Sequence, residues 1–191
     1  ATWAESGKKG GAHIWVQLNH PGRQSPSFLS PEPVAPSAIP YTSDLKRAFN
    51  TPRALSEAEI LEIIDRFAKA AGTVKRAGFT GVQIHGAHGY LVSQFLSPLY
   101  NHRMRFVLEI YRATRHEVGP EFPAGITINS SDFKRNGFTE EEALTVITAL
   151  SEEGIDLVEI SGGNYEAPAM MGDGRGRKKA KKVVLHPTTP S

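Results

Sequence analysis

The chain has 191 residues, 39% of them hydrophobic, with 22 Lys and Arg against 20 Asp and Glu, which is the composition of an ordinary globular protein with one sizeable core. This composition excludes collagen, a coiled coil and a fully disordered chain, and the absence of Cys excludes disulfides and thiolate metal sites. No apolar run reaches the roughly 18 residues of a membrane span, and residues 1–7 lack the order of a signal peptide, so a cytoplasmic location is expected.

Charge divides the chain into two parts. Residues 172–191 hold six of the 22 basic residues and one acid, Asp173, whereas residues 1–171 keep 16 basic and 19 acidic residues, a net charge of −3. A mildly acidic body offers no basic face for phosphates, so neither nucleic acid nor a membrane is expected as a partner. The two predicted regions are a folded domain over 1–171 and a disordered, basic, low-complexity tail over 172–191.

Strands and helices are predicted to alternate along the folded part. Short runs rich in β-branched residues predict four strands, at 13–18, 80–84, 125–128 and 157–160. Apolar residues at helical spacing predict three helices between them, from Ser56 to Gly78, from about Arg103 to Val118 and from Thr139 to Gly154. Two of these helices are predicted to begin at capping boxes, Ser56 with Glu59 and Thr139 with Glu142. Residues 19–55 hold seven of the 13 prolines and predict a long irregular excursion.

This alternation requires crossover connections, and therefore a parallel sheet with helices packed against it. A doubly wound sheet and a (β/α) barrel both fit. Every predicted strand ends in polar residues, and in a barrel all these ends meet at one mouth, where active sites of this architecture lie. The first strand is not followed by Gly-x-Gly-x-x-Gly, which weakens the doubly wound alternative. The polar clusters are Gln17, Asn19 and His20; His85 and His88; Asn129, Ser130, Ser131 and Asp132; and Ser161 and Asn164.

The densest chemical signal is His85-Gly86-Ala87-His88-Gly89-Tyr90. Two imidazoles at this spacing could bind a metal, act as acid and base, or donate hydrogen bonds to an oxygen. A zinc site needs a third ligand with no obvious candidate, so no metal is predicted, although metal-assisted hydrolase or lyase chemistry stays open. Tyr90 is protonated near neutral pH and is a candidate acid. Two N–H donors on one carbonyl oxygen, together with an acid, suit addition to an activated double bond.

Five motifs together resemble one known family. They are Trp15-Val16-Gln17-Leu18-Asn19-His20-Pro21-Gly22-Arg23, Ile84-His85-Gly86-Ala87-His88-Gly89-Tyr90-Leu91, Gln94-Phe95-Leu96-Ser97-Pro98, Asn129-Ser130-Ser131-Asp132-Phe133 and Glu159-Ile160-Ser161-Gly162-Gly163. They closely resemble the Old Yellow Enzyme family of FMN-dependent NAD(P)H oxidoreductases. The resemblance implies an incomplete (β/α)8 TIM barrel of which the chain holds about the third to the sixth strand.

The resemblance also implies cofactors, substrate and residue roles. FMN would be reduced by NADH or NADPH and would reduce small molecules, namely α,β-unsaturated carbonyls or related acceptors. Gln17 would bind the flavin pyrimidine edge, His85 and His88 would hold the substrate oxygen, and Tyr90 would protonate the α-carbon while flavin N5 gives hydride to the β-carbon. Thr127 occupies a flavin-binding position that is usually Arg or Lys in the family, so a lower flavin reduction potential is expected. The sequence does not determine the oligomeric state, and a homo-oligomer is one of the possible states.

An eight-stranded barrel takes about 250 residues. The alternative hypothesis is therefore that the chain is a truncated, non-catalytic fragment or splice product that cannot retain FMN alone.

Overall fold

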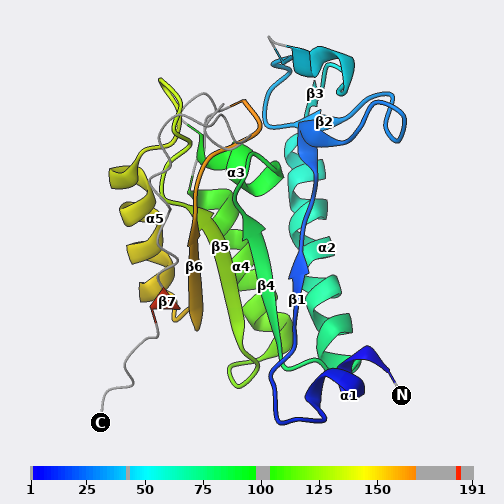
Figure 1. Cartoon of the computed structure of the whole chain (residues 1–191), viewed down its shortest axis with the longest axis vertical. Coiled ribbons are helices and arrows are strands. Elements are labelled where there is room, and N and C mark those ends of the chain that lie inside the picture. The colour runs from blue at the N-terminus through cyan, green and yellow to red at the C-terminus, as the bar shows by residue number, and fades with distance from the viewer. Residues whose placement is uncertain (1, 42–43, 98–103, 167–183, 186–191) are drawn as a thin grey trace.

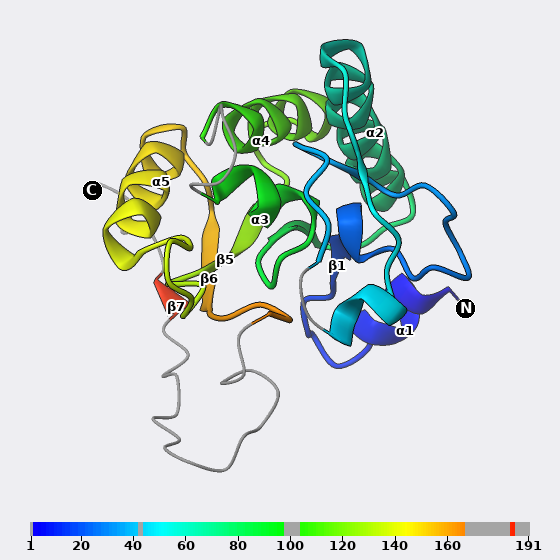
Figure 2. The ribbon, with the colours of Figure 1, turned by 90° about the horizontal axis from the view of Figure 1, so that it is seen from above.

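The computed structural model of the chain describes residues 2–41, 44–97, 104–166 and 184–185. Its main feature is a sheet of five strands in the order β1-β4-β5-β6-β7, with α2, α4 and α5 packed along one side (Figures 1 and 2). The strands of this sheet are β1 (Trp15–Leu18), β4 (Gly81–Gly86), β5 (Ala124–Asn129), β6 (Leu157–Ser161) and β7 (Val184–Leu185). The helices are α1 (Trp3–Lys8), α2 (Glu57–Arg76), α3 (Leu91–Leu96), α4 (Arg105–Val118) and α5 (Glu140–Glu152).

The order of the strands decides between the two predicted architectures. β1, β4, β5 and β6 are parallel neighbours in chain order, and the order never reverses. A doubly wound sheet reverses its strand order at a switch point and covers both faces with helices. The long helices α2, α4 and α5 lie on one side, as in the wall of a barrel, and the described strands form an open arc rather than a closed barrel (Figure 2). The predicted parallel α/β arrangement is confirmed.

Alternation along the strands separates the two faces of the sheet. Val82, Ile84, Ile126 and Ile128 are fully buried against the helices. Their neighbours along each strand point to the other face, because side chains of a strand alternate. The face away from the helices carries Gln83 and the site residues described below.

The helix starts follow the predicted capping boxes. The Ser56 side chain accepts a hydrogen bond from the backbone N–H of Glu59, and the backbone N–H of Ser56 donates to the Glu59 side chain. Thr139 and Glu142 form the same two hydrogen bonds at the start of α5. The same reciprocal pair of hydrogen bonds, between Thr2 and Glu5, begins α1, a helix that was not predicted. Helix α3, fully buried, was also not predicted, because Tyr90 at its N-cap makes no side-chain capping bond.

The Pro-rich excursion is irregular for most of its length, as predicted, but it contains short elements. These are two 3-10 turns, η1 (Gly22–Gln24) and η2 (Asp44–Arg47), and a separate pair of parallel strands, β2 (Val34–Ala35) and β3 (Arg53–Ala54). The segment lies beyond the carboxyl end of β1 and at the N-terminal end of α2 (Figure 1).

Most of the predicted basic tail lies outside the described residues, and its disorder remains a prediction. Val184 and Leu185 are described as β7, which pairs antiparallel with β6. Of the helices in the described part of the chain, none combines the length and the apolar character that crossing a membrane takes.

Candidate active site

A ladder of polar side chains crosses the face of the sheet away from the helices. The Gln17 amide nitrogen donates to Gln83 Oε1 at 2.8 Å and to Thr127 Oγ1 at 3.2 Å. Gln83 and Thr127 in turn donate to the Glu159 carboxylate, at 3.0 and 3.1 Å. One side chain from each of four parallel strands is therefore joined in a single network.

The carboxylate fixes the direction of every bond in this ladder. An ionised Glu159 only accepts, so Gln83 must turn its amide nitrogen toward it and its oxygen toward Gln17. Gln17 must then present its nitrogen to Gln83. The side-chain carbonyl oxygen of Gln17, Oε1, has no hydrogen-bond partner within the described residues, and Gln17 is exposed. The network therefore leaves Gln17 Oε1 available as a hydrogen-bond acceptor at the surface of the sheet.

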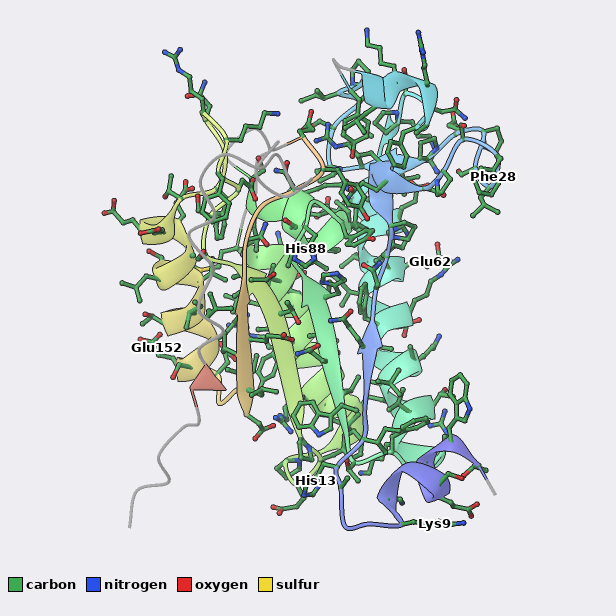
Figure 3. The ribbon with its side chains drawn as sticks, in the orientation of Figure 1. Lys9, His13, Phe28, Glu62, His88 and Glu152 are labelled. Atoms are coloured by element: carbon green, nitrogen blue, oxygen red, sulfur yellow. The ribbon has the colours of Figure 1, made fainter. Side chains whose placement is uncertain are left out.

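Three rings gather where β4 ends and its loop begins. The His85 ring centroid lies 5.3 Å from that of His88 and 4.9 Å from that of Tyr90. His85 pairs across the strands with Thr127, so the cluster stands directly beside the polar ladder. His88 lies at the upper end of the sheet in Figure 3, whereas His13 lies at its opposite end. The structure therefore brings together all five residues predicted for the site: Gln17, His85, His88, Tyr90 and Thr127.

The backbone of His88 is held in an unusual conformation. Its φ is 59°, in the left-handed region that residues other than Gly rarely adopt. Two side chains hold the peptide there: Asn129 Oδ1 accepts from the His88 N–H at 3.3 Å, and Gln24 Nε2 donates to the His88 carbonyl at 3.0 Å. Strain of this kind persists only where the surroundings fix it, and it concentrates at functional sites.

Both imidazoles are neutral at neutral pH. Burial lowers the pKa of His85 to about 4, and repulsion from His88 adds to this effect. Burial also lowers the pKa of His88, while the nearby Glu159 carboxylate opposes the shift at both rings. Each neutral ring has one N–H donor and one acceptor nitrogen. His88 Nε2 lies 2.6 Å from Ser161 Oγ, and the buried His85 Nδ1 has no partner within the described residues.

Tyr90 remains protonated well above neutral pH. Its hydroxyl lies 3.1 Å from that of Tyr165, and this hydrogen bond, followed by burial, raises the pKa of Tyr90 to about 12. A group that keeps its proton at neutral pH and lies beside two neutral imidazoles can act as an acid.

Some residues of the site were not predicted. Gln83 lies two residues before His85 on the same face of β4, a signal that the period of a strand provides. Glu159 and Asn129 were quoted as members of motifs, and Asn129 also as a polar residue at a strand end, but neither was given a role in the site. Tyr165 follows the last predicted strand in a loop, and nothing in its sequence context indicates contact with Tyr90.

The metal alternative lacks a third ligand in the part of the chain that is described. There, His, Cys, Asp and Glu side chains nowhere gather in groups of three or more that could hold a metal ion.

Comparisons with known proteins place the chain in a family. The model of the NADH:flavin oxidoreductase / NADH oxidase family matches residues 2–183. The NADH-dependent flavin oxidoreductase nadA of Aspergillus parasiticus is 43% identical over 87% of the chain, and the NADPH dehydrogenase of Clostridium acetobutylicum is 40% identical over 85%. The chain covers 40% and 49% of these two proteins, so it spans half of their length or less.

Solved structures agree with the sequence comparison. The chain matches a 2-naphthoyl-CoA reductase with a TM-score of 0.80 and 30% identity, over 86% of the chain and 28% of that protein. It matches the Old Yellow Enzyme homologue of Zymomonas mobilis with a TM-score of 0.72 and 28% identity, over 83% of the chain and 50% of that protein. The chain therefore belongs to the NADH:flavin oxidoreductase / NADH oxidase family, whose enzymes work with FMN and NADH or NADPH.

Proposed function

We propose that this chain provides the flavin-facing and acceptor-facing walls of an FMN-dependent oxidoreductase that reduces activated C=C bonds of α,β-unsaturated carbonyls or related acceptors. The observation that carries the proposal is the cluster of two neutral imidazoles and a protonated phenol beside the Gln17 ladder. Membership of the family supports it.

The polar ladder fits a flavin ring. The pyrimidine edge of a flavin offers an N–H donor between two carbonyl oxygens, and the unpartnered Gln17 carbonyl oxygen is an acceptor of the matching kind. Thr127 is 4% exposed, and its hydroxyl both accepts from Gln17 and donates to Glu159. Its role in the proposed site is to hold Gln17 in place. When bound, FMN supplies the hydride chemistry that no protein side chain can supply.

The two imidazoles suit the oxygen of an acceptor. Neutral His85 and His88 each carry one N–H, and that of His88 is available to an acceptor when its Nε2 accepts the Ser161 hydroxyl. The Nδ1 of His85 is a buried polar atom that lacks a partner within the described residues. Two donors aimed at a carbonyl oxygen stabilise the negative charge that develops there, an effect of roughly 3 kcal/mol for a well-placed donor. The bonds that Asn129 and Gln24 make to the His88 backbone keep this ring in position.

Tyr90 completes the reaction by giving its proton to the substrate α-carbon. The phenol is protonated across the physiological pH range, and it lies against the His85 ring, where the acceptor oxygen would bind. The new C–H bond forms as the Tyr90 O–H bond breaks, which leaves a phenolate.

The test separates the two half-reactions by rapid mixing. Tyr90→Phe keeps the ring but removes the proton, so reduction of 2-cyclohexenone should slow about 100-fold or more while flavin reduction by NADH or NADPH stays within about twofold. Tyr111→Phe is the matched control, because it removes a phenol hydroxyl that bonds Arg115 on the helix side of the sheet. Equal losses in both half-reactions of Tyr90→Phe would show that Tyr90 only supports the fold or the flavin.

A further inference from the structure

The segment Asn164-Tyr165-Glu166 lies immediately beyond β6 and is anchored on both sides of its central residue. Asn164 forms an isolated β-bridge with His88, and its side-chain oxygen accepts the N–H of Glu166. The Glu166 carboxylate binds Arg23 at 2.7 Å and Lys134 at 3.0 Å.

These contacts join the loops that follow β1, β4, β5 and β6. The ion pairs are largely shielded, since the side chains of Arg23 and Glu166 are 10% and 13% exposed. The backbone of Tyr165 is therefore fixed by its two neighbours.

This anchoring places two phenols against each other. The hydroxyl oxygens of Tyr165 and Tyr90 lie 3.1 Å apart, and the rings meet edge to face with centroids 6.2 Å apart at 74°. Tyr90 is thus held between His85 on one side and Tyr165 on the other. Either hydroxyl can be the donor of the shared hydrogen bond.

The contact with Tyr165 affects the stability of the Tyr90 phenolate, which forms once Tyr90 has given up its proton. Tyr90 is half-buried beside the His85 ring, so its phenolate is less well solvated than in water and gains from a donor that faces it. The Tyr165 O–H can turn to donate to the phenolate oxygen, and a hydrogen bond to an ionised acceptor is about twice as strong as one between neutral groups. Tyr165 therefore stabilises the pair after it has lost one proton, whereas the raised pKa of Tyr90 belongs to the loss of the second proton.

We propose that Tyr165 is a positioning residue for proton transfer: its hydroxyl stabilises the Tyr90 phenolate and then returns a proton to it, drawn from water. The proposal rests on the proposed role of Tyr90 as the acid. Tyr165 is only partly buried, so water can reach the pair. The proton balance is complete: Tyr90 gives a proton to carbon, Tyr165 gives one to Tyr90, and water replaces the proton of Tyr165.

The test compares Tyr165→Phe, Tyr90→Phe and the double variant in the FMN-loaded enzyme. Tyr165→Phe should slow reduction of 2-cyclohexenone tenfold or more and leave flavin reduction by NADH or NADPH within about twofold. In the Tyr90→Phe background the same change should have no further effect, because Tyr165 acts through Tyr90. If Tyr165→Phe reduces the same enone as fast as the wild type, or slows the Tyr90→Phe variant by the same factor, the proposal is wrong.

A spectroscopic readout does not depend on turnover. With 13Cζ-labelled tyrosine, the wild-type pair should titrate in two steps, the second near pH 12, and both signals should move in the first step. Tyr165→Phe should leave Tyr90 with a single step that lies above the first step of the wild-type pair and below the second, because the variant lacks both the donor that eases the first deprotonation and the charge that opposes the second. Tyr111→Phe should change neither step. An unchanged Tyr90 titration in Tyr165→Phe overturns the proposal even if the enzyme is active.

The two proposals fail in different ways. If Tyr90→Phe reduces the enone normally, the proposed role of Tyr90 is wrong, whatever Tyr165→Phe does. If Tyr90→Phe is slow and Tyr165→Phe is not, only the role of Tyr165 is wrong.

Discussion

His85 connects the stability of the protein to pH at the scale of one residue. Its pKa falls from 6.5 in the unfolded chain to about 4 in the fold. Between these pH values the unfolded chain binds a proton that the folded chain does not. Above pH 6.5 His85 is neutral in both states, so its titration leaves the free energy of unfolding unchanged. As the pH falls from 6.5 toward 4, the unfolded chain takes up the proton first, and the free energy of unfolding falls.

We expect His85 alone to lower the free energy of unfolding by roughly 3 kcal/mol between pH 7 and pH 4. His85→Gln should remove this part of the pH dependence, whereas His13→Gln, at an exposed position, should keep it. Urea denaturation at both pH values measures the difference. Identical pH dependence in the wild type and His85→Gln would contradict the assignment.

Thr127 offers a second test at the residue scale. A flavin gains negative charge on reduction, and a neutral Thr next to Glu159 supplies no cation to stabilise that charge. Thr127→Lys should therefore raise the flavin midpoint potential by on the order of 30 mV, which is about 1.4 kcal/mol for a two-electron couple. Thr145→Lys adds the same charge at an exposed position of α5 and should leave the potential unchanged. A potential that does not rise in Thr127→Lys would place this residue away from the flavin.

At the scale of the elements, Gly residues on β4 and β5 make room for the Trp15 side chain of β1. The Trp15 ring covers Gly81 and Gly125, and a Cβ on Gly125 would lie 2.9 Å from the Leu157 carbonyl oxygen and 3.1 Å from Trp15. Backbone atoms of a neighbouring strand cannot move aside easily, so such overpacking is destabilising.

Gly125→Ala should therefore lower the free energy of unfolding by about 1–3 kcal/mol. Gly10→Ala is the matched control, because an added Cβ at Gly10 meets nothing within 4 Å. Denaturation in urea compares the two variants with the wild type. If both lose the same small amount, Trp15 does not pack against the strands as described.

The elements also show how far sequence reasoning reached. The four parallel strands and the long helices α2, α4 and α5 were predicted, because they depend on local periodicity and on capping pairs such as Ser56 with Glu59. Helix α3 was missed, since it has only six residues, all of them buried including Ser93 and Gln94, and no side chain caps its start. β7 was missed because its pairing with β6 depends on a long-range contact that no local pattern encodes.

The candidate site was predictable to a similar extent. His85, His88 and Tyr90 share one loop, so their proximity follows from the sequence itself. The contact between Tyr90 and Tyr165 joins residues 75 positions apart, and the ladder from Gln17 to Glu159 crosses four strands. Such contacts depend on the register of the sheet, which periodicity does not specify.

At the scale of the whole molecule, the described strands form an arc in which the parallel strands β1, β4, β5 and β6 end at the same edge of the sheet (Figure 1). The chain spans half or less of the length of the two relatives compared above. The proposed activity is therefore that of a flavin site to which this arc contributes Gln17, His85, His88 and Tyr90.

The central claim is that side chains from separate strands and loops face one flavin. NMR of the protein with labelled His, Tyr and Gln side chains, titrated with FMN, tests it most directly. The signals of His85, His88, Tyr90 and Gln17 should shift together with one dissociation constant, while His13, His116 and Tyr111 stay unchanged. If FMN binds and leaves the first group unchanged, or shifts its members with different dissociation constants, the account of the site is wrong. Binding that occurs only when further barrel strands are supplied would instead support the fragment hypothesis for the isolated chain.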